Sequence, residues 1–274
     1  MRIARTRTPA LALGLLLACL AQSAVAADLF FATRVGTSWG TGDGTGELDL
    51  AGVGGSGDDN DASPVYGAAG GIAVPLSDLM PYSMSLPSFD VPIWPGKAIH
   101  FTGSEDFRFP GWRTLLEVET LWGRDFDFET NSGSDLNPFR SEVESASFLG
   151  NFRLDVPIQA PITALFGRLP MLEPMTLYTG GGVGMSWNEI TTRGPANFGS
   201  DETWDFAYQY MAGIGYALTD QLHLSVGWRY FNLGELELDI SDVNNGSYDI
   251  EVGAHEVTTS LRFHFYHVPF FGQE

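Results

Sequence analysis

The chain has 274 residues and is acidic, with 34 Asp and Glu residues, 14 Lys and Arg residues and a formal net charge of −20. This charge argues against nucleic acid and anionic lipid surfaces as partners. Cys19 is the only cysteine, which excludes a disulfide framework, a cysteine metal site and a cysteine nucleophile. The 33 glycines and 13% aromatic residues are typical of a sheet protein with many turns and an aromatic girdle.

The N-terminus predicts an export signal. Three arginines lie within the first seven residues, Ala10–Leu20 is apolar, and an A-x-A pattern ends at Ala26. We expect residues 1–26 to be a signal peptide that is cleaved after Ala26. Removing its three arginines leaves 11 basic residues against 34 acidic ones. No later segment approaches the roughly 18 apolar residues of a transmembrane helix.

Eight stretches of the mature chain alternate between bulky apolar residues and Gly, Ser or charged residues. Each is about ten to fifteen residues long, whereas strands of soluble sandwiches have about five or six. A sandwich would bury its apolar rows, but here the small and polar rows suit a narrow lumen. The pattern predicts an all-β fold, an eight-stranded antiparallel transmembrane β-barrel over residues 27–266. The predicted strands are Asp28–Thr41, Val65–Leu76, Gly111–Phe128, Ser145–Val156, Thr176–Ile190, Trp204–Leu218, Gln221–Asn232 and Glu256–Phe265.

The third stretch, Gly111–Phe128, shows the pattern most clearly. Its apolar row begins with Trp112 and ends with Trp122, and its opposite row contains Glu117 and Glu119. Ten tilted residues rise roughly 25 Å, the height of the apolar band of an outer-membrane barrel. Tryptophan favours both edges of such a band, so Trp112 predicts the periplasmic edge and Trp122 the outer one.

The connections alternate in character, as they do in outer-membrane barrels. A tight turn is predicted at Thr219-Asp220, whereas long acidic external loops are predicted at Thr41–Pro64, Asp125–Glu144, Thr191–Thr203 and Asn232–His255. Two periplasmic connections are unexpectedly long. The proline-rich residues 76–110 fit a periplasmic excursion, a lumen plug or two further strands, which leaves eight or ten strands open. The other, Pro157–Pro174, could hold a short helix at Ile162–Leu169.

The last strands resemble a known family. Tyr178–Gly184 and Ala212–Phe231 look like strands of the eight-stranded outer-membrane barrels of the opacity (Opa-like), OmpA and OmpX type. Thr258–Phe265 is similar to the assembly signal of these barrels and ends on Phe263 and Phe265, with residues 267–274 as an extension. The resemblance implies the cell outer membrane, contact with its bilayer and lipopolysaccharide, and recognition by the barrel-assembly machinery.

Two groups of side chains are candidates for a structural role. Lumen-facing charges are expected to pair as a plug, or alternatively as a gated narrow pore. This lumen network consists of Arg34, Arg113, Glu117, Glu119, Arg153, Arg229 and Arg262, with Asp155, His223 and His264 facing the same lumen. The predicted interface girdle consists of Trp39, Trp112, Trp122, Trp187 and Trp228.

The sequence favours a structural or surface-interaction role through the external loops, with no extracellular ligand identified. A narrow porin for small solutes is the alternative, and a lipid-modifying enzyme is the least favoured reading. Of the histidines, only His255 lies near the outer rim, where a lipid hydrolase would need one, so no catalytic residue is predicted. Asp58-Asp59-Asn60-Asp61 lacks calcium-loop spacing, so neither a metal nor a cofactor is predicted.

Overall fold

A computed structural model describes residues 27–48, 51–58, 62–79, 89–94, 97–101, 111–131, 138–159, 170–193, 198–240 and 246–265. The predicted signal peptide, the helix predicted at Ile162–Leu169 and the extension at 267–274 lie outside these ranges. Within them, no helix is both long and apolar enough to cross a membrane.

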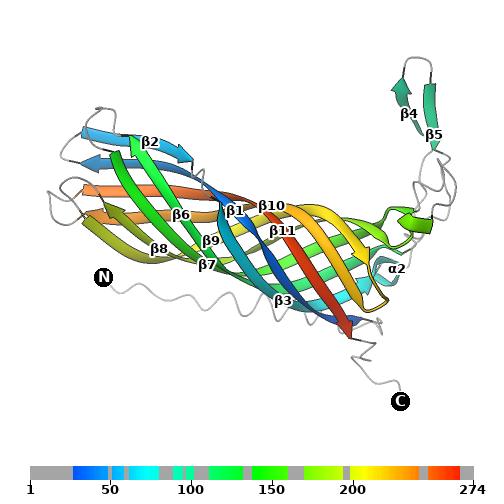
Figure 1. The fold of residues 1–274 in the computed structure, drawn as a ribbon. Coiled ribbons are helices and arrows are strands. Elements are labelled where there is room, and N and C mark those ends of the chain that lie inside the picture. Colours follow the sequence, from blue (N-terminus) through cyan, green and yellow to red (C-terminus); the bar gives the residue numbers. More distant parts are fainter. Residues whose placement is uncertain are drawn as a thin grey trace.

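Eight antiparallel strands form a closed barrel, which confirms the predicted fold class (Figure 1). Neighbouring strands follow the order β1-β3-β6-β7-β8-β9-β10-β11, and β11 closes the barrel by pairing with β1 from Leu29↔Phe265 to Glu47↔Ser247. The barrel strands are β1 (Asp28–Leu48), β3 (Ser63–Pro75), β6 (Arg113–Asn131), β7 (Pro138–Pro157), β8 (Met175–Arg193), β9 (Phe198–Ala217), β10 (Leu222–Ile240) and β11 (Gly246–Phe265).

The strands extend well beyond their predicted ends, so the predicted extent of the external loops is wrong. β10 and β11 remain paired out to Ile240↔Gly246, and most of the predicted loop Asn232–His255 is therefore a hairpin. The predicted loops Asp125–Glu144 and Thr191–Thr203 are likewise largely strand. In Thr41–Pro64, β2 (Ala51–Asp58) pairs with the outer half of β1 on the edge that β3 occupies further down.

Two glycine bulges explain why the alternation was lost at those points. Gly123 has a φ of 89° and Gly234 a φ of 100°, a region that glycine adopts without strain. The strand register shifts between Leu121 and Arg124 in β6, and between Asn232 and Gly234 in β10. Each bulge inserts an extra residue and so exchanges the odd and even positions that face inward. A period of two therefore cannot be continued through either glycine.

The long connection after β3 is described in part. It contains the short helix α2 (Leu76–Leu79) and a separate two-stranded hairpin of β4 (Phe89–Trp94) and β5 (Lys97–Phe101). Figure 1 shows this hairpin away from the barrel, beyond the end at which β1 begins and β11 finishes. This connection thus contains two further strands, but they do not join the barrel, which has eight. After β7, the 3-10 helix η2 (Pro170–Leu172) lies in the other long connection.

The outward face of the barrel changes character along the strands. Toward the terminal end, exposed apolar side chains form a belt that includes Phe152, Ile214 and Leu261. Above the belt, one outward row carries Asp125, Glu144, Glu189 and Glu202, which oppose one another on β6, β7, β8 and β9. An apolar belt below an acidic collar is the polarity expected of a barrel embedded in lipid at one end and in water at the other.

Candidate functional site

Three layers of charged side chains fill the lower and middle lumen. The central layer is built on Glu117 and Glu119, neighbours on the inner row of β6. Arg34 donates to both oxygens of Glu117 at 2.7 and 2.9 Å and also pairs with Glu119. Arg229 reaches Glu119 from β10 at 3.0 Å. Two guanidinium groups thus balance two carboxylates, all of them buried.

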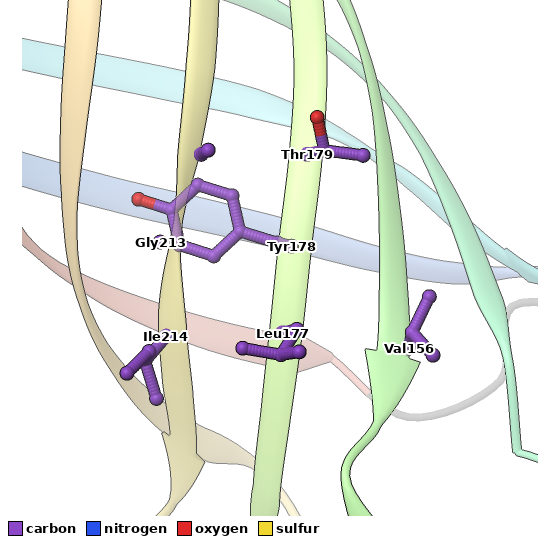
Figure 2. Close-up of a pocket in the computed structure, with 7 residues that line it drawn as sticks. Val156, Leu177, Tyr178, Thr179, Gly213 and Ile214 are labelled. Atoms are coloured by element: carbon purple, nitrogen blue, oxygen red, sulfur yellow. The ribbon is translucent and has the colours of Figure 1, made fainter. Parts of the chain in front are cut away.

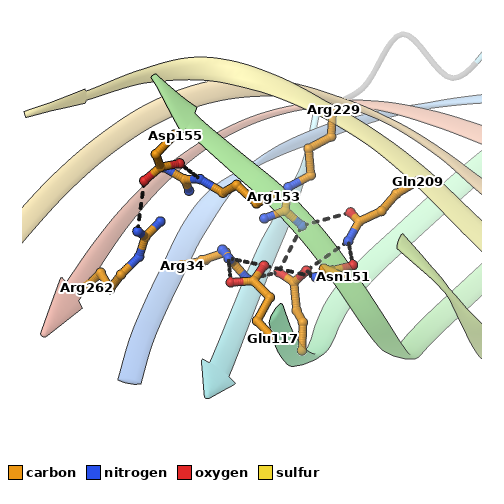
Figure 3. Close-up of polar contacts among 9 residues, drawn as sticks. Arg34, Glu117, Asn151, Arg153, Asp155, Gln209, Arg229 and Arg262 are labelled. Carbon is orange, nitrogen blue, oxygen red and sulfur yellow. Dashed lines mark hydrogen bonds and ion pairs between the residues drawn. The ribbon is translucent and has the colours of Figure 1, made fainter. Parts of the chain in front are cut away.

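Two amide side chains complete this layer (Figure 3). Asn151 donates to Glu117 at 3.0 Å and to Glu119 at 2.6 Å, and Gln209 donates to Glu119 at 2.9 Å. Gln209 also accepts a hydrogen bond from Arg229 at 3.2 Å. Both amides lie on predicted inner rows but are not members of the predicted lumen network, which consists of charged side chains. Their uncharged donors satisfy the remaining carboxylate oxygens without adding charge to the lumen.

The second layer lies nearer the terminal end of the barrel and is centred on Asp155. Arg153 donates to Asp155 at 2.6 Å, and Arg262 donates to its other oxygen at 3.2 Å. Each guanidinium also lies over an aromatic ring, Arg153 at 3.6 Å from the centre of Tyr178 and Arg262 at 5.1 Å from that of Phe30. Figure 3 shows this cluster set apart from the one around Glu117.

The third layer, which the sequence did not indicate, lies above the central layer. Arg124 donates to Glu256 at 2.6 Å and to the Ser147 hydroxyl at 3.0 Å, and its guanidinium lies 4.2 Å from the centre of the Phe231 ring. Arg124 follows the Gly123 bulge, which turns it inward. Only recognition of that glycine as a bulge could have placed Arg124 in the lumen.

The outer lumen is apolar, which corrects the expectation of a polar lumen throughout. A cluster of fully buried side chains fills it, drawn from β3 and from every strand from β6 to β11. Phe126 and Phe128 enter it after the first bulge, Leu233 lies within the second, and Leu236 follows it. Beyond the acidic collar the barrel therefore has the apolar interior and polar exterior of a water-soluble sheet protein.

The remaining predicted lumen residues lie at the terminal mouth. Arg113 is half-buried at the start of β6 and makes no ion pair within the described residues. His223 is half-buried and His264 buried, with ring centres 4.7 Å apart. His255, the candidate at the rim, stacks on Trp228 at 5.7 Å. No nucleophile is held against His255 in the described part of the chain, where its ring contacts are aromatic.

The predicted girdle residues lie on the outer surface, although not equally exposed. Trp39, Trp122 and Trp228 are exposed, whereas Trp112 and Trp187 are half-buried. Trp204, opposite Trp187 in the β8–β9 register, is 60% exposed and was not predicted. At the terminal end, Phe263 and Phe265 are exposed with ring centres 5.2 Å apart. A role in the membrane interface or in assembly remains a prediction for these residues.

A groove of about 550 Å³ crosses the outward face of β7, β8 and β9 (Figure 2). Val156, Leu177 and Ile214 line it, and small residues such as Ala212 form its floor. Behind Gly213 the ring of Tyr178 closes the wall, because no side chain stands between the ring and the groove. The groove is apolar and belongs to the outward belt.

Comparisons with known proteins agree with this architecture. The chain matches the family model described as outer membrane protein beta-barrel domain over residues 101–265. Uncharacterized proteins of Brucella abortus and Brucella suis are 36% identical over 75 residues, which is 24% of this chain. The alignment spans 26% of the length of these curated relatives.

Three solved structures resemble the chain in outline. The outer membrane protein AlkL is 16% identical, with 93% of this chain and 97% of that chain covered and a TM-score of 0.43. The outer membrane protease OmpT from Escherichia coli is 12% identical, with 87% and 97% covered and a TM-score of 0.42. The outer membrane protein OprG from Pseudomonas aeruginosa is 11% identical, with 88% and 98% covered and a TM-score of 0.41.

Proposed function

This chain belongs to the outer membrane protein beta-barrel domain family, and we propose that it is a sealed anchor that presents an acidic β-structured projection at the cell surface. The proposal rests on how the lumen is filled: two kinds of side chain, charged and apolar, block it one above the other. Buried ion pairs fill the lower and middle lumen, and a fully buried apolar cluster fills the outer lumen.

The polar filling supports closure because its charges are paired. Arg34 and Arg229 share Glu117 and Glu119, and Arg124 is paired with Glu256. Moving one partner would leave a buried charge uncompensated, which costs about 3–5 kcal/mol. Thermal motion therefore opens these layers only rarely.

The apolar filling adds a second barrier of a different kind. Fourteen side chains in the cluster have 0 or 1% of their surface exposed. An ion that entered it would lose its hydration without gaining a polar partner. This barrier does not depend on the ion pairs below it, so a solute would have to cross both.

The outer extension supports a role in surface presentation. Strand pairing continues well above the apolar belt, to Glu47↔Ser247 between β1 and β11 and to Ile240↔Gly246 between β10 and β11. Its interior has a core of its own, and outward carboxylates such as Glu144, Glu202 and Glu251 cover its described surface. A packed projection of this kind holds an acidic face in a fixed arrangement, as an interaction surface requires.

Planar-bilayer recording tests the closure. We expect the refolded protein to give no stepwise conductance at moderate voltage, since both fillings must open together. Reproducible steps of uniform size would contradict the sealed anchor and favour the narrow porin. Heat-modifiable migration on a gel controls for correct folding.

Cysteine labelling on intact cells tests the display. Because Cys19 is the only cysteine of the chain and lies in the predicted signal peptide, Glu202→Cys and Met171→Cys each give a mature protein with one thiol. Both positions are exposed, at opposite ends of the barrel. A membrane-impermeant maleimide should label Glu202→Cys on whole cells and Met171→Cys only after lysis. Labelling of Met171→Cys on intact cells would overturn the proposed orientation.

A further inference from the structure

The terminal mouth of the lumen carries a positive charge that its own carboxylates do not balance. In the central layer two arginines face two glutamates, and Arg124 faces Glu256 alone. At the mouth the arginines are Arg113, Arg153 and Arg262, whereas the carboxylates are Asp155 and, on the first inner position of β1, Asp28. Among the described residues, this layer alone has one guanidinium in excess.

Unused polar atoms lie along the inner row of β11 at this mouth. Ser260, Arg262 and His264 alternate along the strand and face inward, and all are more than nine-tenths buried. The Ser260 Oγ, the Arg262 Nε and both ring nitrogens of His264 have no hydrogen-bond partner within the described chain. Buried polar groups are normally paired, and leaving one unpaired costs about 1–3 kcal/mol. Several such atoms on one row point to a missing partner that accepts hydrogen bonds.

Cationic and aromatic side chains surround this row. The ring centres of His223 and His264 lie 4.7 Å apart, and Arg113 begins the inner row of β6 at the same mouth. Arg113 and His223 are half-buried, so part of each side chain is accessible from the mouth. Arg262 uses one terminal nitrogen for Asp155 and leaves its Nε free, and Phe30 supports its guanidinium plane.

We propose that the terminal mouth of the barrel binds a phosphate-type oxyanion between Arg113 and His223, with Arg262, His264 and Ser260 behind it. A guanidinium fork matches the geometry of a tetrahedral oxyanion and donates two parallel hydrogen bonds to it. One bound oxyanion supplies both the missing negative charge and the missing acceptors. The oxyanion is either a free anion or the headgroup of a phospholipid whose chains lie in the neighbouring leaflet. The site does not depend on whether the lumen conducts.

The experiment measures phosphate binding by the full mature chain in dodecyl maltoside micelles. Inorganic phosphate is titrated by calorimetry in a chloride-free buffer. We expect saturable binding at one site, weakened about tenfold by Arg262→Gln because a charge-assisted pair of hydrogen bonds is lost. Arg113→Gln should weaken binding several-fold and serves if Arg262→Gln does not give the heat-modifiable form.

Arg140→Gln is the matched control. It removes the same charge from an exposed ion pair with Asp127 far from the mouth, so the phosphate affinity should not change. Absence of saturable binding to the folded wild type would overturn the proposal. Equal affinities in Arg262→Gln, Arg113→Gln and Arg140→Gln would overturn it as well.

Nanodiscs separate the two sources of the oxyanion. Phosphate is titrated into the protein in discs of phosphatidylcholine and in discs that also contain phosphatidylglycerol. If phosphate binds more weakly in the second discs, and Arg113→Gln removes this difference between the discs, the occupant is a lipid headgroup. Equal affinity in both discs would identify a free anion.

Discussion

Glu119 is the residue on which the central layer depends most. It receives Arg34 and Arg229 as ion pairs and Asn151 and Gln209 as hydrogen-bond donors, and none of its side-chain surface is exposed. Glu119→Gln should lower the free energy of unfolding by about 3–5 kcal/mol, because it leaves two buried guanidinium groups with one carboxylate. Urea unfolding in micelles or vesicles measures this. The exposed pair Arg140–Asp127 gives the comparison, since Arg140→Gln should cost at most about 1 kcal/mol. Equal losses in the two variants would show that the central layer is not energetically coupled.

Position 227 requires glycine because a neighbouring side chain lies too close for a Cβ atom, not because of its backbone conformation. A Cβ at Gly227 would overlap with the Tyr178 hydroxyl, whose ring lies across the lumen wall beneath Arg153. Gly227→Ala should therefore destabilise the barrel by about 1–3 kcal/mol through overpacking. Gly150→Ala is the matched change, because the nearest atom to its Cβ would be 3.9 Å away. A lower midpoint temperature for loss of heat-modifiability in Gly227→Ala, but not in Gly150→Ala, is the expected result.

At the scale of the strands, the acidic collar is a row of like charges in register. Glu189 on β8 lies directly opposite Glu144 on β7 and Glu202 on β9. Like charges in this relation destabilise a sheet, and opposite charges contribute about 0.2–1 kcal/mol per pair. Glu189→Lys should therefore stabilise the folded barrel at low salt, and the gain should shrink at high salt as the charges are screened. Asp201→Lys makes the same charge change opposite Ile190 and should not stabilise comparably. Equal gains from both variants would mean that net charge, not register, sets the effect.

The strands also show where alternation in the sequence predicts the inward-facing residues and where it does not. Where a strand has no bulge, as in β7, alternation places every inward residue from Ser145 to Asp155 correctly. In β6 and β10 it fails at Gly123 and Gly234, because one inserted residue reverses the alternation and nothing in a single sequence separates a bulge glycine from the others. The inward turn of Arg124, and of Phe126, Phe128 and Leu236 in the outer core, was missed for this reason.

For the molecule as a whole, closure of the barrel and its eight strands could be predicted, because each strand carries its own apolar outward row. The resemblance to outer-membrane barrels is confirmed by the family match over residues 101–265. Partner choice within the lumen could not be predicted. Arg34 meets Glu117 across 83 positions of sequence, and such pairs follow from strand tilt and stagger rather than from spacing.

If two independent barriers close the lumen, removing either one alone should leave it closed to ions. Replacing Asp155, Glu119 and Glu256 together by Ala opens all three polar layers and should still give no conductance, because the apolar cluster above them excludes hydrated ions. Phe126→Ala with Phe231→Ala thins the apolar cluster alone and should likewise stay silent, since the ion pairs below remain intact. Only the variant that combines all five changes should produce conductance steps in planar bilayers, with heat-modifiable migration showing that it is folded. Steps from either partial variant would mean that the intact layer is no barrier, and the lumen would then be closed at a single level.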